Sequence, residues 1–343
     1  MKASELRKLP RTGLSLSLLG LGCAPLGNLF SAVSDAQALA TVDAAWAAGL
    51  RYFDTAPFYG HGLSEHRLGQ ALRERPRAQY CVSTKVGRLL KPKAGKPAEK
   101  QNGWVAPLPF EPQFDYSAGG IRRSLEDSLQ RLGMASIDMA LVHDIGGATR
   151  GDLQGHYWQQ LTEGGGLREL ESLRDEGLVG SVGLGVNEWE VVVDVLEHLD
   201  LDCTLLAGRY TLLDQSALHP FLDIAAQRRV GVVIGGPFNS GILATGPTRD
   251  AKFDYGAAPP EIVMRAEQLQ AICSEFDIPL AAAALQFPLA HPAVVSCVPG
   301  ARNVQELQQV AAWLETPVPA ALWARLLEQG LLLPGTPLPI AEA

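Results

Sequence analysis

The chain has 343 residues, of which 47% are hydrophobic and 19% charged, and its formal net charge at pH 7 is −8. This composition is typical of a soluble globular protein, and the acidic excess argues against a nucleic-acid-binding protein, which normally carries a basic face. No apolar run approaches the ~18–20 residues of a membrane span and the amino terminus lacks the apolar core of a signal peptide, so we expect a cytoplasmic protein with no membrane partner.

Eight short apolar runs alternate with helical patterns along the whole chain. The runs are almost continuously apolar, as parallel strands buried on both faces are. A doubly wound sheet could also hold eight strands, but no composition break divides the chain. The unbroken alternation therefore predicts one (β/α)8 barrel, a TIM barrel, spanning residues 1–343. The predicted strands are residues 15–23, 50–54, 80–85, 137–144, 178–185, 203–208, 230–236 and 293–300.

Helix boundaries are marked by capping residues in several places. After the first strand, Ser34 is a predicted N-cap, and Gln37 three residues later completes a capping box. Ser64 is the predicted cap of the next helix. A later helix is predicted over 117–132, with Gly133 as its stop signal.

Residues 86–116, between the third strand and the following helix, interrupt the alternation of strands and helices. Several prolines and a local excess of lysine predict irregular structure. A linker between domains would have this composition too, but the barrel pattern resumes in register beyond the segment. Long loops inside compact domains usually serve as lids or binding loops, so we expect a lid or substrate loop.

Polar residues stand where the apolar strands end, which is the end of a β/α barrel that carries the chemistry. Asp54 ends the second strand and Tyr59 lies in the loop after it. Lys85 ends the third strand, His143 ends the fourth, and Asn187 follows the fifth. Any one of these residues alone would be an ordinary strand-end cap. Four titratable groups on three neighbouring strands favour a functional site.

The chemistry of these four groups is complementary. A free tyrosine has a pKa near ~10, and a nearby ammonium such as that of Lys85 would lower it. Asp54 can hold the lysine charged, while His143 hydrogen-bonds a substrate oxygen and Tyr59 exchanges its proton. The set therefore predicts general acid/base work on a carbonyl or an alcohol. Such a site needs a bound hydride carrier for redox chemistry.

Neither a metal nor a standard nucleotide motif accompanies the set. The five cysteines form no CxxC pair, and His61 and His66 have poor ligand spacing, so we expect no metal. No GxGxxG or Gly-Lys-Ser/Thr loop is present. The best phosphate-binding candidate is the helix start after the eighth strand, beside Gly300 and Arg302.

These segments resemble the aldo-keto reductases, in order and across nearly the whole chain: FDTAPFYGHGLSEHRLGQAL, STKVG, SLEDSLQRLGMASIDMALVHD, GSVGLGVNEW and VPGARNVQEL. The resemblance implies a catalytic tetrad of Asp54, Tyr59, Lys85 and His143, and an NAD(P) cofactor lying over the barrel end. It implies that Asn187 contacts the nicotinamide carboxamide. The cofactor contacts that it implies are Gly22, Cys23, Ala24, Asp54, Asn187, Gly235, Pro237, Phe238, Ser240, Gly241, Pro299, Ala301, Arg302 and Glu306.

Two departures from the family pattern concern the cofactor. Gly235 stands where an aromatic residue often stacks on the nicotinamide, and Phe238 or Trp189 could compensate. Glu306 stands where members that prefer NADP often have Arg. A carboxylate repels a 2′-phosphate and can accept a bond from a free ribose hydroxyl, so we expect NAD rather than NADP. Arg302 is the counterargument, because it could pair with a phosphate.

Within the family, the sequence most resembles the D-threo-aldose 1-dehydrogenase branch, with its L-fucose and L-galactose dehydrogenases, and the related pyridoxal 4-dehydrogenase. The first expectation is oxidation of the anomeric carbon of an aldose (L-fucose, L-galactose or D-arabinose type) to a lactone. Alternatives are a pyridoxal 4-dehydrogenase, an NADPH-dependent aldehyde reductase and, last, a non-enzymatic regulatory subunit. Monomer and homodimer both remain open. Candidate substrate contacts are Phe58, Trp104, Phe110, Trp158 and Trp189.

Overall fold

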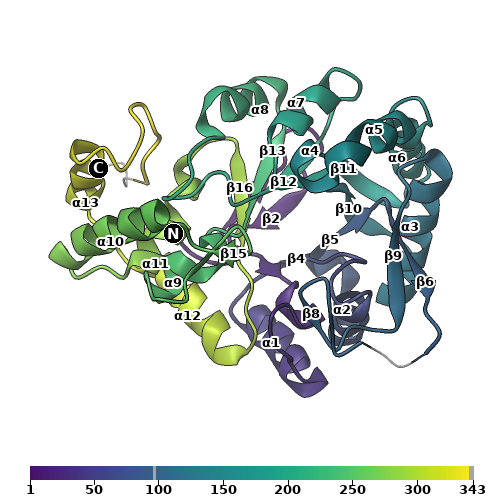
Figure 1. The fold of residues 1–343 in the computed structure, drawn as a ribbon, viewed down its shortest axis with the longest axis horizontal. Helices are drawn as coiled ribbons and strands as arrows, with labels where there is room; N and C mark the ends of the chain where they lie inside the picture. Colours follow the sequence, from purple (N-terminus) through teal and green to yellow (C-terminus); the bar gives the residue numbers. More distant parts are fainter. Residues whose placement is uncertain (96–97, 340–343) are drawn as a thin grey trace.

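The protein is described from a computed structural model, which covers residues 1–95 and 98–339. Its core is an eight-stranded parallel sheet in the order β3-β4-β5-β10-β11-β12-β13-β16, surrounded by helices (Figure 1). Isolated parallel bridges from Leu19 to Cys297 and from Gly22 to Gly300 join the first strand to the last. The TIM-barrel prediction is confirmed. The strands are β3 (Leu21–Gly22), β4 (Tyr52–Asp54), β5 (Cys81–Val86), β10 (Ile137–His143), β11 (Val179–Val186), β12 (Cys203–Ala207), β13 (Gly231–Gly235) and β16 (Val294–Val298).

The predicted first strand, residues 15–23, is two elements rather than one. Ser15–Ser17 forms β2, which pairs antiparallel with β1 (Leu6–Lys8), and β3 alone belongs to the barrel. Leu9 and Leu16 of this hairpin are fully buried in one cluster with side chains from the barrel strands, such as Met139. The hairpin therefore fills the amino-terminal end of the barrel and leaves the opposite end, called the mouth below, for other residues.

Helices cover the outside of the barrel (Figure 1). The Ser34 and Gln37 capping box is formed, Ser117 caps the predicted 117–132 helix, and Gly133 ends it in the left-handed conformation. The helices used below are α1 (Asp35–Ala47), α2 (Leu63–Leu72), α3 (Ala118–Leu132), α5 (Gln154–Leu161), α7 (Glu190–Leu196), α9 (Ile242–Thr245), α10 (Pro260–Glu275) and α12 (Val304–Glu315).

The predicted cap at Ser64 is wrong. The N-cap of α2 is Gly62, and Ser64 is already inside the helix and fully buried. Its hydroxyl donates to the carbonyl of Cys23 and hydrogen-bonds the Thr55 hydroxyl. The serine therefore connects the loops after β3 and β4, a tertiary role that local sequence could not distinguish from capping.

The segment 86–116 is also more regular than its composition predicted. β6 (Arg88–Pro92) pairs antiparallel with β9 (Phe110–Phe114), and β7 (Lys100–Gln101) pairs with β8 (Trp104–Val105). Prolines fit here because both strands of a two-stranded sheet are edge strands. Leu29 forms an isolated bridge with Trp104, so the segment lies against the loop after β3. Residues 96–97 of the predicted lid lie outside the described residues.

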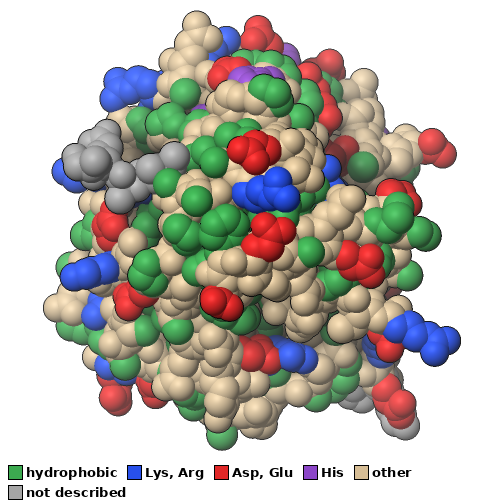
Figure 2. Space-filling view, turned by 90° about the vertical axis from the view of Figure 1, so that its left-hand side faces the viewer, with side chains coloured by type: hydrophobic (Ala, Val, Ile, Leu, Met, Phe, Trp, Pro, Cys, Tyr) green, Lys and Arg blue, Asp and Glu red, His purple; other side chains and the backbone are tan. Residues whose placement is uncertain are grey.

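The surface carries charges of both signs. On the face shown in Figure 2, acidic and basic side chains are interspersed among hydrophobic and neutral ones. Within residues 1–95 and 98–339, no helix combines the length and the apolar character needed to cross a membrane.

Candidate active site

A buried ion pair joins the ends of β4 and β5. Lys85 Nζ donates to both carboxylate oxygens of Asp54, at 2.9 and 2.8 Å, and to the carbonyl of Thr55 at 3.0 Å. The Ser83 hydroxyl also donates to Asp54, at 2.6 Å. The side chains of Lys85 and Asp54 are 2% and 4% exposed. All three ammonium hydrogens are satisfied, which is the condition under which a buried pair of charges is tolerated.

Tyr59 lies beside this pair in the loop between β4 and α2. Lys85 Nζ is 4.7 Å from the centroid of the tyrosine ring. The loop is held by a close approach of two backbones: a Cβ on Gly27 would lie 2.5 Å from the carbonyl carbon of Tyr59, and one on Gly60 would lie 2.5 Å from the carbonyl oxygen of Gly27. Glycine at both positions therefore brings the loops after β3 and β4 together and places Tyr59 at the mouth.

The environment of Tyr59 favours its protonated form. Burial raises the pKa of Tyr59 well above its ordinary value, the carboxylates of Asp54 and Asp144 raise it further, and Arg88 opposes them. The sequence led us to expect that Lys85 would lower this pKa. In the structure all the ammonium hydrogens of Lys85 are engaged elsewhere and its charge is paired with Asp54, so the direction of the shift is reversed.

His143, the last residue of β10, lies close to Tyr59 and Phe58. Its ring centroid is 6.1 Å from that of Tyr59 and 6.2 Å from that of Phe58. Burial lowers the pKa of His143 well below its ordinary value, and the charges of Arg88 and Lys85 lower it further. The imidazole is therefore neutral at neutral pH. Its Nδ1 atom is buried without a hydrogen-bond partner, and its Nε2 atom lies 3.5 Å from Asp144 Oδ2.

One predicted substrate residue from the segment 86–116 packs against the rings of Phe58 and Tyr59. Trp104 in β8 is 3% exposed, and its ring centroid lies 5.5 Å from that of Tyr59 and 5.7 Å from that of Phe58. Its indole Nε1 is buried without a partner. Phe58, Tyr59 and Trp104 thus form an aromatic wall beside the ion pair.

The other predicted substrate aromatics are placed elsewhere. Trp158, in α5, packs edge-on against His198 at 5.7 Å, and Trp189 stacks on Phe221 at 6.4 Å. Trp158 and Trp189 thus pack against rings other than those of Phe58 and Tyr59. Phe110 is half-buried at the start of β9.

The predicted cofactor residues come from four loops around the mouth. Gly22 allows the barrel to close, because a Cβ there would lie 2.7 Å from the carbonyl oxygen of Val298. A Cβ at Gly235 would lie 2.8 Å from a methyl group of Leu205, so a larger residue at this position would require Leu205 to move. Cys23 and Ala24 follow β3, Asp54 ends β4, and Asn187 follows β11. The segment after β13 contributes Pro237, Phe238, Ser240 and Gly241, and the segment after β16 contributes Pro299, Ala301, Arg302 and Glu306.

Both proposed replacements for that aromatic pack against other aromatic rings. Phe238 packs edge-on against Trp313 of α12, with 5.7 Å between centroids, and Trp189 is stacked on Phe221. The expectation that either one compensates for Gly235 is therefore not supported by the geometry.

The side chains present nevertheless fit a nicotinamide dinucleotide. Asn187 Nδ2 donates to Asp144 at 3.1 Å, which leaves the amide oxygen of Asn187 to accept from a carboxamide. Beside α12, Arg302 Nε donates to Glu306 at 2.9 Å, and the Arg302 backbone N–H donates to the same carboxylate at 2.8 Å. The donors and acceptors that a carboxamide and a ribose need are thus present at opposite parts of the mouth.

Two charged residues of this site were not singled out from the sequence. Arg88 forms an ion pair with Asp144, and its guanidinium lies 4.3 Å from the ring centroid of Phe58. Asp144 directly follows His143, and Arg88 is three residues beyond Lys85. The rule that selected the other residues, polar groups where apolar strands end, would have selected Asp144, whereas Arg88 lies three residues beyond the predicted strand.

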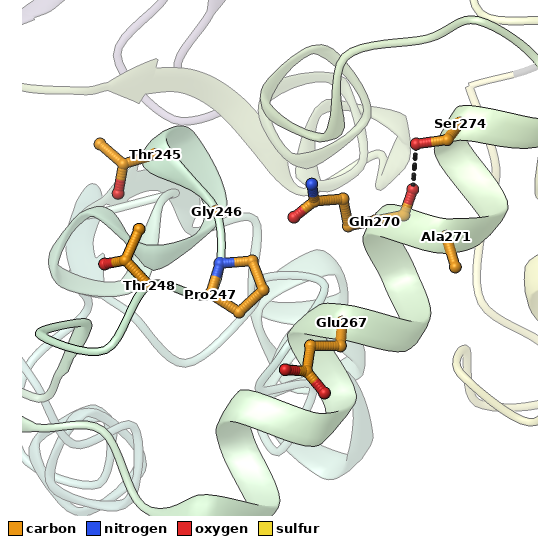
Figure 3. A pocket seen from close by; sticks show the side chains of 8 residues that line it. All are labelled: Thr245, Gly246, Pro247, Thr248, Glu267, Gln270, Ala271 and Ser274. Atoms are coloured by element: carbon orange, nitrogen blue, oxygen red, sulfur yellow. Dashed lines mark hydrogen bonds between the residues drawn. The ribbon is translucent and has the colours of Figure 1, made fainter.

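A separate surface pocket contains none of these residues. It has a volume of about 440 Å³ and lies between the end of α9 and the carboxyl-terminal half of α10 (Figure 3). Its lining includes Thr245, Pro247, Glu267 and Gln270. Across the described part of the chain, no group of three or more His, Cys, Asp or Glu side chains is arranged to hold a metal.

Comparison with known proteins gives one consistent result. The sequence profile of the Aldo/keto reductase family matches residues 18–329. The chain is 49% identical over 340 residues to pyridoxal 4-dehydrogenase of Microbacterium luteolum, covering 97% of this chain and 99% of that protein. It is 41% identical over 324 residues to D-threo-aldose 1-dehydrogenase of a Pseudomonas species, covering 93% and 96%. L-galactose dehydrogenase of Arabidopsis thaliana is 31% identical over 317 residues, with coverage of 91% and 88%.

Solved structures agree in fold. An aldo-keto reductase of Bacillus halodurans in its holo form superposes with a TM-score of 0.74 at 24% identity, covering 96% of each chain. The glycerol dehydrogenase of Gluconobacter oxydans also gives 0.74, at 22% identity, covering 100% of this chain and 99% of that one. At these identities the likeness concerns the fold alone.

Proposed function

Because this chain belongs to the aldo/keto reductase family and is an NAD(P)-dependent oxidoreductase, we propose that it oxidises a cyclic hemiacetal to a lactone, with pyridoxal as the first candidate substrate. The observation that carries the proposal is the position of Tyr59 between the buried Lys85–Asp54 pair and the neutral His143. This arrangement moves one proton at one substrate oxygen, as the oxidation of a hemiacetal hydroxyl requires.

Each residue has a distinct part in the proposed reaction. The phenolate of Tyr59 accepts the proton of the hemiacetal hydroxyl, and its phenol returns a proton in the reverse direction. Lys85, fixed by Asp54, supplies the positive charge nearest the tyrosine ring. His143, which is neutral, orients the hydroxyl by donating a hydrogen bond to its oxygen. A bound nicotinamide supplies the hydride acceptor that these side chains lack.

Pyridoxal and an aldose remain the two substrate candidates. Both can form a cyclic hemiacetal, and relatives named for each resemble this chain at 49% and 41% identity. The wall of Phe58, Tyr59 and Trp104 favours pyridoxal, because a planar ring stacks on aromatic side chains over a larger area than a sugar does. We therefore rank pyridoxal first and an aldose of the L-fucose or L-galactose type second.

Initial rates over a substrate panel test this proposal. The panel contains pyridoxal, L-fucose, L-galactose and D-arabinose with NAD or NADP, and simple aldehydes with NADPH. We expect NADH formation with pyridoxal or with one of the sugars. If every hemiacetal is inert while simple aldehydes are reduced with NADPH, the protein is an aldehyde reductase. If none of these substrates reacts although the cofactor binds, the regulatory-subunit hypothesis is favoured.

NAD is the proposed physiological cofactor. The carboxylate of Glu306 lies 2.6 Å from the Arg302 guanidinium. This ion pair engages the arginine that could otherwise pair with a 2′-phosphate. The arginine that argued for NADP is thus engaged within the protein.

Glu306→Gln is expected to shift cofactor preference towards NADP. Removing the carboxylate frees Arg302 and ends the repulsion, so the affinity for NADP relative to NAD should rise about tenfold, equal to ~1.4 kcal/mol. Fluorescence titration with both dinucleotides measures the ratio. Glu315→Gln, at the other end of α12, is the charge-matched control. An unchanged ratio in Glu306→Gln would remove Glu306 from cofactor discrimination.

The proposed role of Tyr59 predicts opposite pH dependences for the two directions. Because its pKa is raised, the phenol predominates below that pKa, and the phenolate fraction grows about tenfold per pH unit. The oxidation rate should therefore rise between about pH 7 and 10, whereas reduction, which uses the phenol, should not rise. Initial rates in both directions check this expectation. An oxidation rate that falls over this range would exclude Tyr59 as the base.

A further inference from the structure

A second buried ion pair lies next to the first, between the loops after β5 and β10. The guanidinium of Arg88 contacts Asp144 Oδ2, and the two side chains are 3% and 13% exposed. The guanidinium also lies over the Phe58 ring at 4.3 Å. Neither residue has a part in the reaction proposed above.

The carboxylate of Asp144 contacts the side chains of three residues. Its Oδ1 accepts from Asn187 Nδ2 at 3.1 Å. Its Oδ2 takes the guanidinium of Arg88 and lies 3.5 Å from His143 Nε2. One side chain thus contacts both the residue expected at the nicotinamide carboxamide and the residue expected at the substrate hydroxyl.

The backbone holds that carboxylate in place. Asp144 has a φ of +45°, in the left-handed region that residues other than glycine seldom adopt. Its N–H donates to Gly185 at 3.0 Å, and its carbonyl accepts from Arg150 Nε at 2.8 Å and from the Tyr116 hydroxyl at 3.3 Å. Bonds from three other elements therefore maintain an unfavourable conformation at this position, which is typical of functional sites.

We propose that Asp144 is a positioning residue that fixes the orientation of the Asn187 amide and the tautomer of His143, and that the contact with Arg88 holds the Asp144 carboxylate in place. This inference rests on the proposed function for the roles of those two residues. With Asn187 Nδ2 bonded to Asp144, the amide oxygen of Asn187 must face the opposite way. With an anion facing Nε2, the His143 proton resides on Nε2, and this N–H donates to the oxygen of the substrate hydroxyl, whose own hydrogen goes to Tyr59.

A purely structural role for the pair gives a different expectation. In that case the pair serves only to join the loops after β5 and β10. Replacing both charges by neutral groups of similar shape should then restore stability and leave the neighbouring side chains unchanged. The double variant Arg88→Met/Asp144→Asn separates the two roles.

The double variant has a specific predicted outcome. The amide oxygen introduced by Asp144→Asn can still accept from Asn187, so stability and cofactor affinity should approach the wild-type values. The introduced amide nitrogen would then face His143 Nε2, which must become an acceptor, and the proton should move to Nδ1. Turnover should fall at least tenfold, because Nε2 then has no hydrogen to donate to the oxygen of the substrate hydroxyl.

In the single variant Asp144→Asn, by contrast, one amide oxygen cannot serve both Arg88 and Asn187. This variant should lose stability and at least tenfold in cofactor affinity as well. Arg88→Lys keeps the charge and should retain the wild-type tautomer.

Nitrogen-15 NMR of the histidine rings in the cofactor-free protein tests the inference directly. The signals of His143 are identified among those of the seven histidines by their loss in His143→Gln. We expect Nε2–H as the main species in the wild type and Nδ1–H in the double variant. Nδ1–H in the wild type, or Nε2–H retained in the double variant, would overturn the proposal. Because no substrate takes part, this result is independent of whether the substrate panel supports the proposed function.

Discussion

Replacing Tyr59 by phenylalanine should lower kcat by roughly 10²–10⁴-fold while the cofactor still binds. The substitution removes one hydroxyl group. It leaves the ring contacts with Trp104 and His143, at 5.5 and 6.1 Å, in place. In the proposed reaction that hydroxyl is the group that accepts the substrate proton. Initial rates with the best substrate of the panel give kcat, and tryptophan quenching by NAD gives the dissociation constant.

Tyr80→Phe is the matched control for this substitution. Tyr80 packs against Trp46 and Phe53, outside the mouth, and its loss of a hydroxyl should leave turnover within about twofold of wild type. If Tyr59→Phe retained comparable activity, Tyr59 would not be the proton-transfer residue, and the proposed mechanism would be wrong.

The second large effect is expected for Lys85→Met. This substitution leaves the carboxylate of Asp54 buried without its cation, and removing one member of a buried pair costs about 3–5 kcal/mol. Turnover should also be lost, because the methionine carries no charge beside Tyr59. Urea denaturation measures the free energy of unfolding, and initial rates measure activity.

A surface pair provides the control for the stability effect. Arg75 and Asp43 form an ion pair at 2.7 Å whose side chains are 33% and 59% exposed, so Arg75→Met should cost about 1 kcal/mol or less. Equal costs for Lys85→Met and Arg75→Met would contradict the burial and the full pairing of Lys85 described above.

Sequence patterns predicted the barrel and the residues of its mouth because both depend on regular rules. Apolar runs of strand length gave the architecture, and the position of polar residues at strand ends led to Asp54, Lys85 and His143. The capping signals at Ser34 and Gly133 depend on contacts within one helical turn, and the structure confirms both.

The errors concern features that depend on contacts distant in the chain. Ser64 has the sequence context of a cap, but its bonds go to Thr55 and to the Cys23 carbonyl, 41 residues away. The sheet formed within residues 86–116 was obscured by proline, which two-stranded sheets accept. The direction of the Tyr59 pKa shift depends on how Lys85 and Asp54 share their charges, which spacing along the chain does not show.

The aromatic residues show the same limit within the site. From the sequence, Trp104 and Trp158 were equally good candidates for substrate contacts, because both were expected to lie in long loops. The bridge from Leu29 brings the first against Tyr59, whereas the second packs against His198. Asp144 satisfied the strand-end rule and Arg88 did not, and the importance of both became visible only through their shared contact.

The central claim is that this protein oxidises a ring-closed hemiacetal. The most direct test compares pyridoxal with 5-deoxypyridoxal, which lacks the hydroxyl needed to close the ring, in the presence of NAD. The proposed function predicts that pyridoxal gives NADH and its lactone in equal amounts, identified by mass spectrometry, and that the deoxy compound gives neither. Equal oxidation of both compounds, or formation of an acid without a lactone, would contradict it.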